Sequence, residues 1–167
     1  MPTRIRLQDG VFAEVEDPFT AVADDQDIPK GDVIISLARF QTEGDRLISE
    51  GRAVGVRIEP AEEVEALAYD LAGLAMVAVT FPKYRDGRGY TSGRVLRERM
   101  GFKGEIRAVG EVLREQAGFM ARCGFDGFEA ADGSTPDQWA RAVRRHRHVY
   151  QRAADARPPA FVEREEG

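Results

Sequence analysis

From residue 54 onward, the sequence alternates four times between a short apolar run and a longer segment with helical spacing. The apolar runs are VGVRIEP, AMVAVTFP, GEIRAVG and FDGFEA. In the first long segment, the apolar residues Val64, Leu67, Leu71 and Leu74 lie three or four positions apart, as on one face of a helix. Four consecutive strand–helix units with short connections predict a parallel sheet with right-handed crossovers.

The long segments predict helices over residues 60–74, up to Gly101, 111–124 and 134–153. The last one opens on Ser134 or Thr135 followed by Pro136, which is a typical helix start. Gly101 and Gly124 stand where the second and third helices are expected to end, because glycine is common just after a helix.

Two architectures of class α/β fit these four units, and they differ in whether the sheet curls toward a barrel. Four βα units are half of a (β/α)₈ barrel, which the N-terminal segment would plug or a second copy of the chain would complete. The alternative is an open doubly wound sheet. Arg57 and Arg107 lie inside predicted strands, and an inner barrel layer accepts such charges better than a sheet covered by helices on both faces. The half-barrel is therefore the first prediction.

The length of 167 residues favours a single domain. Residues 1–53 are predicted to form an irregular, β-containing cap, with a hairpin around Asp9-Gly10 and a short strand near Val33. Residues 54–152 contain the four βα units, and residues 153–167 are expected to be a flexible tail.

Composition excludes several classes of protein. The net charge of −5 argues against a nucleic-acid binder or an anionic-membrane binder. No apolar run approaches the length of a membrane span and no signal peptide is recognisable, so a cytoplasmic protein is expected. No phosphate loop, dinucleotide fingerprint or zinc pattern occurs, and no cofactor or metal is evident.

The stretch that follows the second apolar run is the candidate binding loop. In parallel α/β folds, loops at the carboxyl ends of strands form the functional face. Two glycines, two arginines and free helix N–H groups would there hold an oxyanion or an acidic group of a partner. The alternative is a connecting loop in which Asp86 caps the turn and the arginines pair with acidic neighbours. The candidate residues are Tyr84, Arg85, Asp86, Gly87, Arg88, Gly89, Tyr90, Thr91 and Ser92, with Thr91 and Ser92 as candidate N-caps.

A second candidate is a group of charges on the predicted strands, Arg57, Glu59, Arg107 and Glu129. Glu59, Arg107 and Glu129 are the candidate catalytic residues, and Arg57 would assist anion binding. The alternative is a layer of ion pairs that satisfies itself.

The single cysteine, Cys123, falls in the last turn of a predicted helix, where the helix dipole does not activate a thiol. It is therefore expected to be a packing residue. His146 and His148 lie two positions apart on a predicted helix and do not form a chelating pair.

Residues 81–129 resemble the core of a bacterial family, domain of unknown function 934. The most specific motifs are DGRGY, LRER, RAVGEVL and RCGFDGFE. Members of this family are described as candidate oxidoreductases of sulfite reduction. The resemblance therefore implies a place in assimilatory sulfate reduction, with sulfite reductase components or other proteins of that pathway as partners.

Three functions follow as hypotheses. The first is an accessory protein of sulfite reduction that binds an oxyanion or a partner's acidic group at residues 84–92. The second is a small half-barrel enzyme, such as an oxidoreductase, acting on a small anionic substrate. The third is a structural subunit that oligomerises without catalysis. The absence of a redox cofactor motif leaves open whether the protein is an enzyme.

Overall fold

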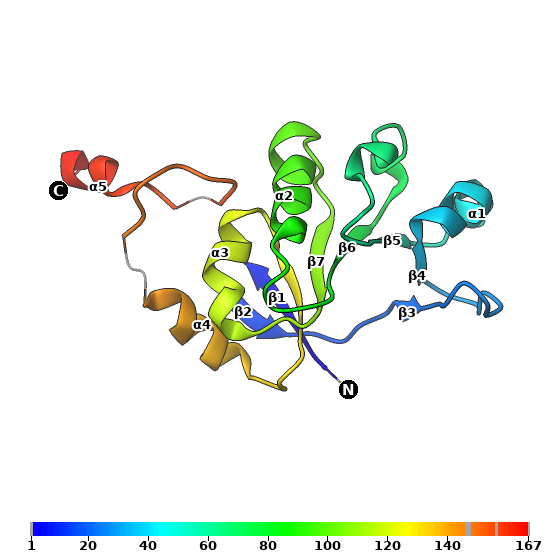
Figure 1. Cartoon of the computed structure of the whole chain (residues 1–167), viewed down its shortest axis with the longest axis horizontal. Coiled ribbons are helices and arrows are strands. Elements are labelled where there is room, and N and C mark those ends of the chain that lie inside the picture. The colour runs from blue at the N-terminus through cyan, green and yellow to red at the C-terminus, as the bar shows by residue number, and fades with distance from the viewer. Residues whose placement is uncertain (1, 146–147, 156, 167) are drawn as a thin grey trace.

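The computed structural model of the protein describes residues 2–145, 148–155 and 157–166. Its centre is an eight-stranded sheet in the order β2-β1-β8-β7-β6-β5-β4-β3 (Figure 1). The strands are β1 (Thr3–Gln8), β2 (Val11–Glu14), β3 (Thr20–Ala21), β4 (Val33–Ser36), β5 (Val54–Ile58), β6 (Met76–Phe81), β7 (Glu105–Gly110) and β8 (Gly127–Ala130). The sheet is curled like half a barrel, and the fold is mixed α/β.

Strands β3 to β8 pair in parallel. Strands β1 and β2 form the hairpin predicted around Asp9-Gly10, and β1 also pairs antiparallel with β8. The N-terminus therefore extends the sheet beside its last parallel strand. Because β4 to β8 run in one direction, the segments that follow them all leave from one edge of the sheet.

The helical elements differ from the prediction in length and number. The α-helices are α1 (Leu37–Ser49), α2 (Arg88–Arg94), α3 (Ala117–Arg122), α4 (Pro136–Arg144) and α5 (Ala160–Glu166). The shorter elements are the 3₁₀ helices η1 (Val64–Leu67), η2 (Leu71–Gly73) and η4 (Arg114–Gln116), and η3 (Val95–Arg99), a π-helical turn that continues α2.

The helix predicted over residues 60–74 is wrong, because this segment contains only η1 and η2. Val64 and Leu67 are buried, whereas Tyr69 between the two turns is almost fully exposed. Apolar residues three positions apart also lie on one face of a 3₁₀ helix. The spacing therefore placed the correct side chains in the core without distinguishing the two kinds of helix.

Helices α4 and α1 also differ from the prediction in part. Helix α4 begins as predicted, with the Thr135 hydroxyl accepting a hydrogen bond from the Gln138 N–H at 3.4 Å. It ends at Arg144 instead of near residue 153, and Tyr150 is exposed. The sequence analysis did not predict α1, which follows β4 directly and whose N-cap Ser36 accepts from the Arg39 N–H at 3.2 Å.

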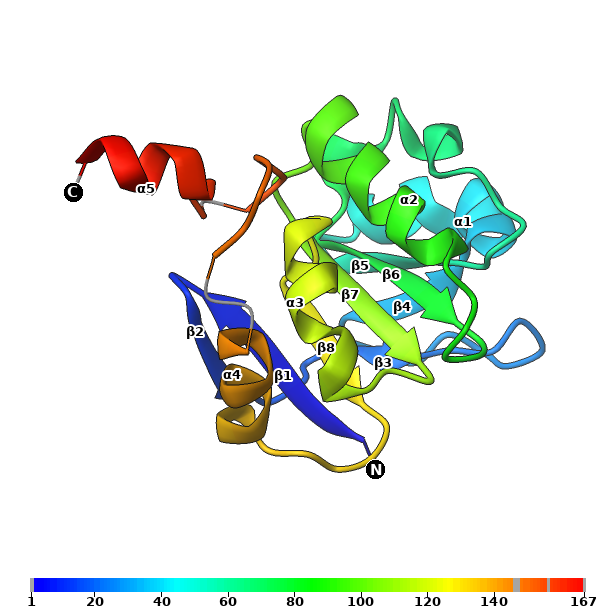
Figure 2. The same ribbon diagram turned by 60° about the vertical axis from the view of Figure 1, so that its left-hand side comes forward.

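The two faces of the sheet differ in what covers them. Side chains from α1, η3, α3 and α4 join one large hydrophobic core with the strands, and Figure 2 shows α2 and α3 crossing this face. The opposite face carries only a small apolar cluster of Ile34, Met76 and Ala78, against which Phe19 and Val109 pack. No described helix packs on this face, here called the helix-free face, and it also carries several charged residues of the strands, among them Arg4, Arg107 and Glu129. Within the described residues, no helix is both long and apolar enough to cross a bilayer.

Candidate functional site

The candidate binding loop lies between the carboxyl end of β6 and α2. Lys83, Tyr84 and Arg85 are all exposed at its tip. The Tyr84 N–H donates to the Glu111 carboxylate at 2.7 Å, and the Asp86 N–H donates to the Lys83 carbonyl at 2.9 Å. These two hydrogen bonds hold the tip as a defined turn against the end of β7.

The Arg88 side chain is exposed, but its guanidinium pairs with Asp86. Its Nη2 and Nε atoms lie 2.7 Å and 3.0 Å from the two Asp86 carboxylate oxygens, and its N–H donates to Oδ1 at 3.2 Å. Hydrogen bonding to Arg88 lowers the pKa of Asp86, and the same contact raises the pKa of Arg88. Among the described residues, Arg85 has no hydrogen bond or ion pair, so it is the arginine of the loop that remains available.

Several other residues of the loop belong to the packing of α2. The helix begins at Arg88 after the N-cap Gly87, so the prediction of Thr91 and Ser92 as N-caps is wrong; both lie inside the helix. The N-cap was misplaced because Gly87 offers no side chain to reveal it. A Cβ at Gly89 would come within 2.6 Å of the Phe81 ring, so glycine here permits close packing of α2 on β6.

Tyr90 is half-buried behind the loop. Its ring contacts Phe81 edge-on at 5.1 Å between centroids, and its hydroxyl accepts from Gln116 Nε2 at 3.1 Å. Burial raises the pKa of the Tyr90 hydroxyl. The residue therefore supports the base of the loop, while the exposed tip carries the groups that can meet another molecule.

The second candidate site surrounds Arg107 on the helix-free face. This guanidinium is 0% exposed. Its Nη1 lies 2.7 Å from Asp17 and 3.3 Å from Glu129, its Nη2 lies 3.0 Å from Asp17, and its Nε lies 2.8 Å from Glu105. Burial by itself lowers the pKa of Arg107, but the hydrogen bonds to Asp17 and Glu105 outweigh this and the net pKa is raised. Arg107 therefore remains charged.

Four charged residues of this cluster were not predicted from the sequence: Arg4, Arg6, Asp17 and Glu105. Arg4 and Arg6 project from β1 and both pair with Glu105, while Asp17 reaches Arg107 from the segment between β2 and β3. The alternation of Arg4 and Arg6 on one face of a strand was visible in the sequence. The antiparallel pairing of β1 with β8, which brings them to β7, was not.

The predicted catalytic residues fall into two groups. Arg107 and Glu129 are in contact, but Glu59 forms a separate ion pair with Arg57 at 3.0 Å. The Glu59 carboxylate also accepts a hydrogen bond from the Thr80 hydroxyl at 3.3 Å. Arg57 and Arg107 both pair in register with Ala78 of β6. One strand therefore separates the groups, a spacing of about 10 Å. Glu59 and Glu129 do not meet at one reacting atom in this conformation.

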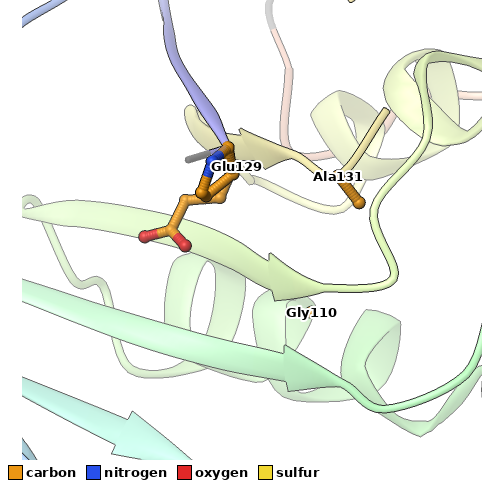
Figure 3. A pocket seen from close by; sticks show the side chains of 4 residues that line it. Gly110, Glu129 and Ala131 are labelled. Carbon is orange, nitrogen blue, oxygen red and sulfur yellow. The ribbon is translucent and has the colours of Figure 1, made fainter. Parts of the chain in front are cut away.

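A hollow of about 480 Å³ borders the Arg107 cluster at the carboxyl ends of β7 and β8. It is lined by Pro2, Gly110, Glu129 and Ala131, and Figure 3 shows the Glu129 side chain extending over β7. The Glu129 carboxylate thus touches both the hollow and Arg107.

Cys123 lines a hollow together with Tyr90 and Thr91 at the base of the candidate loop, whereas the described histidine, His148, lies in the C-terminal segment. Cys123 is buried, and burial raises its pKa to about 11. His148 pairs with Glu163 at 2.7 Å, and His146 lies outside the described residues. Within the part of the chain that the structure describes, no group of three or more His, Cys, Asp or Glu side chains is arranged to hold a metal ion.

The comparison with protein families agrees with the motifs of the middle third. The model of DUF934, described as a bacterial protein of unknown function, matches residues 55–161. The chain belongs to the DUF934 family. The match covers all but the first residue of β5, the strands β6 to β8 and the candidate loop, whereas Arg4, Arg6 and Asp17 lie before it. No curated protein matches the chain. The description of DUF934 assigns no activity.

Proposed function

We propose that this DUF934 protein is an accessory protein of assimilatory sulfite reduction that docks an acidic group of a partner on the 84–92 loop. The observation that carries the proposal is the exposed tip of that loop, where Lys83 and Arg85 flank Tyr84. The pathway rests on the description attached to the family that residues 81–129 resemble.

The tip combines features that suit protein recognition. Tyrosine and arginine are enriched in the contacts that dominate binding energy. The loop is restricted before any partner arrives, by the hydrogen bond from the Tyr84 N–H to Glu111 and by the Asp86–Arg88 pair. Such preorganisation lowers the entropic cost of binding. The positive side chains would steer an acidic partner toward the tip.

The Arg107 cluster is less suited to this role in the free protein. Its guanidinium is enclosed by Asp17, Glu105 and Glu129, and none of its surface reaches solvent. A partner's side chain can reach Arg85 without any rearrangement, whereas Arg107 requires one.

The test reverses the charge of the loop and of a matched control surface. The loop variant is Lys83→Glu with Arg85→Glu, and the control is Lys103→Glu with Arg141→Glu, two exposed cations on other elements. Both variants change the net charge by the same amount. The loop variant should lose capture of sulfite reductase components and growth on sulfate, while the control keeps both. Retention of capture and growth by the loop variant would overturn the proposal, as would failure of the wild-type protein to capture any component.

A small enzyme is the second candidate function, and the position of Glu59 favours it. Glu59 is half-exposed at the carboxyl end of β5, beside Arg57 and the Thr80 hydroxyl. In this arrangement, Arg57 and the Thr80 hydroxyl are able to bind a small anionic substrate, and the Glu59 carboxylate is able to accept a proton from it. Glu59→Gln keeps the shape of the side chain. If it abolishes growth on sulfate while partner capture persists, the enzyme is favoured over the accessory protein.

A further inference from the structure

The segment between β2 and β3 crosses the helix-free face, where the Asp17 carboxylate fastens its middle. We call residues 15–19 the strap. Its Val15 N–H donates to the Arg4 carbonyl, and Phe19 packs on the small apolar cluster. Between these points, Asp17 makes two hydrogen bonds to Arg107, at 2.7 Å and 3.0 Å. The exposed neighbours Glu16 and Pro18 make no hydrogen bond within the described residues. The Asp17–Arg107 pair therefore holds the middle of the strap.

Asp17 forms hydrogen bonds with Arg107 but leaves the Nε–H of Arg4 without a partner. Arg4 is only 9% exposed, yet its Nε atom has no hydrogen-bond partner. This Nε lies 3.9 Å from Oδ2 of Asp17, the same oxygen that lies 2.7 Å from Nη1 of Arg107. Two arginines thus converge on one oxygen that reaches only one of them. A planar carboxylate with two acceptor atoms does not fill the space between them.

The charges around this point balance only while the strap is in place. Arg4, Arg6 and Arg107 face Asp17, Glu105 and Glu129. Asp126, which also contacts Arg6, has a second cationic partner in Arg97. Without Asp17, the three arginines exceed the two remaining carboxylates by one charge. An anion in the place of Asp17 would restore the balance.

The point between Arg4 and Arg107 lies close to the surface. The Asp17 side chain is 29% exposed, and Glu129, whose carboxylate lies 3.3 Å from Arg107, lines the hollow of about 480 Å³. Figure 3 shows Glu129 at this hollow. Movement of the strap would open the side of Arg107 that Asp17 now covers. The side-chain Nε–H of Arg4 would then point toward the space that Asp17 leaves.

We propose that Arg107 and Arg4 form a binding site for a small inorganic oxyanion, and that Asp17 occupies this site in the free protein. The class of ligand follows from the geometry, because a trigonal or tetrahedral oxyanion offers a third acceptor oxygen to Arg4 while it binds Arg107. Binding releases the strap from the helix-free face and exposes Phe19. This site is on a different surface from the 84–92 loop, and the inference does not depend on the proposed function.

The first experiment measures sulfate, sulfite and phosphate binding by calorimetry at constant ionic strength, with acetate as the planar comparison. Asp17→Asn removes the internal competitor and keeps its shape. It should bind at least one oxyanion about tenfold or more tightly than the wild-type protein, because an attached group competes at an effective concentration in the millimolar range. Asp24→Asn is the control, since Asp24 lies in the next connection, between β3 and β4, and contacts Ser36 instead of an arginine.

A double variant and a proteolysis measurement complete the test. Adding Arg4→Met to Asp17→Asn should abolish the gain in affinity. In the wild-type protein, the bound oxyanion should speed chymotrypsin cleavage after Phe19, because the strap leaves the apolar cluster. Equal oxyanion affinity of Asp17→Asn and Asp24→Asn overturns the site. Acetate binding as tight as that of every oxyanion overturns the ligand class. Partner capture by the 84–92 loop is measured separately, so failure of one inference is distinguishable from failure of the other.

Discussion

Asp17 and Arg107 lie 90 positions apart in the sequence, and they form a two-point ion pair on the helix-free face of the sheet. The pair joins the connection between β2 and β3 to β7. Because Arg107 is fully buried, this contact ties the N-terminal third of the chain to the parallel strands.

The first prediction concerns the stability that this pair contributes. Asp17→Ala should lower the free energy of unfolding by about 1–3 kcal/mol, since Arg107 loses two charge-assisted hydrogen bonds but keeps Glu105 and Glu129. Asp24→Ala, in the next connection between β3 and β4, should change it by about 0.5 kcal/mol at most. Urea denaturation measures both. Equal midpoints for the two variants would contradict a structural role of the pair.

The second prediction concerns Gly110, which follows the buried part of β7 and lines the hollow. Its φ is +99°, and a Cβ there would lie 2.4 Å from the Phe81 carbonyl oxygen. Gly133 also has a positive φ, +66°, but a Cβ there would meet nothing within 4 Å.

Alanine at either position therefore introduces a backbone strain of about 1 kcal/mol or more. Gly110→Ala must also displace main chain, and it should destabilise the protein by about 1–3 kcal/mol beyond Gly133→Ala. Thermal unfolding of the two variants gives the comparison. Similar losses would show that the end of β7 can move away from Phe81.

The third prediction concerns the Cys123 thiol. Its pKa is raised to about 11 by burial, and the side chain is 1% exposed. At pH 8, a rise of the thiol pKa from about 9 to about 11 reduces the thiolate fraction about 100-fold. Iodoacetamide should therefore modify the native protein at least about 100-fold more slowly than the urea-unfolded chain. Comparable rates would assign Cys123 a reactive, accessible environment.

The fourth prediction concerns the pH dependence of the Asp86–Arg88 pair. Arg88 lowers the pKa of Asp86 in the folded protein. The stabilisation is therefore complete above the ordinary aspartate pKa and is lost as the pH falls through the lowered value. Arg88→Gln should return the Asp86 pKa toward its ordinary range in a carboxyl NMR titration.

Arg85→Gln is the control for this titration, because Arg85 does not contact Asp86. It should leave the Asp86 titration unchanged. The stability difference between Arg88→Gln and the wild-type protein should be present at neutral pH and disappear below both pKa values. A difference that persists in acid would assign the effect to packing of the Arg88 side chain.

The sequence predicted the order and position of β5 to β8, the hairpin at Asp9-Gly10 and the start of α4 at Thr135, because each depends on residues close together in the chain. Helix type and helix length were predicted less well from the sequence. Apolar residues at spacings of three and four fit α-helix and 3₁₀ turns alike, so residues 60–74 were assigned to the wrong kind of helix. Their burial was nevertheless correct for Val64 and Leu67.

By itself, the sequence determined that the chain alternates strands and helices and that the polar loop of residues 84–92 follows a buried strand. Local spacing and glycine placement are sufficient for such inferences. Only the tertiary structure decided that Arg88 pairs with Asp86 while Arg85 remains available, and that Arg4 and Asp17 meet at Arg107. These contacts depend on the pairing of β1 with β8 and on the path of the strap, which join residues about 90 to 100 positions apart. No local pattern records them, because the energy of a buried charge depends on which distant groups the fold brings to it.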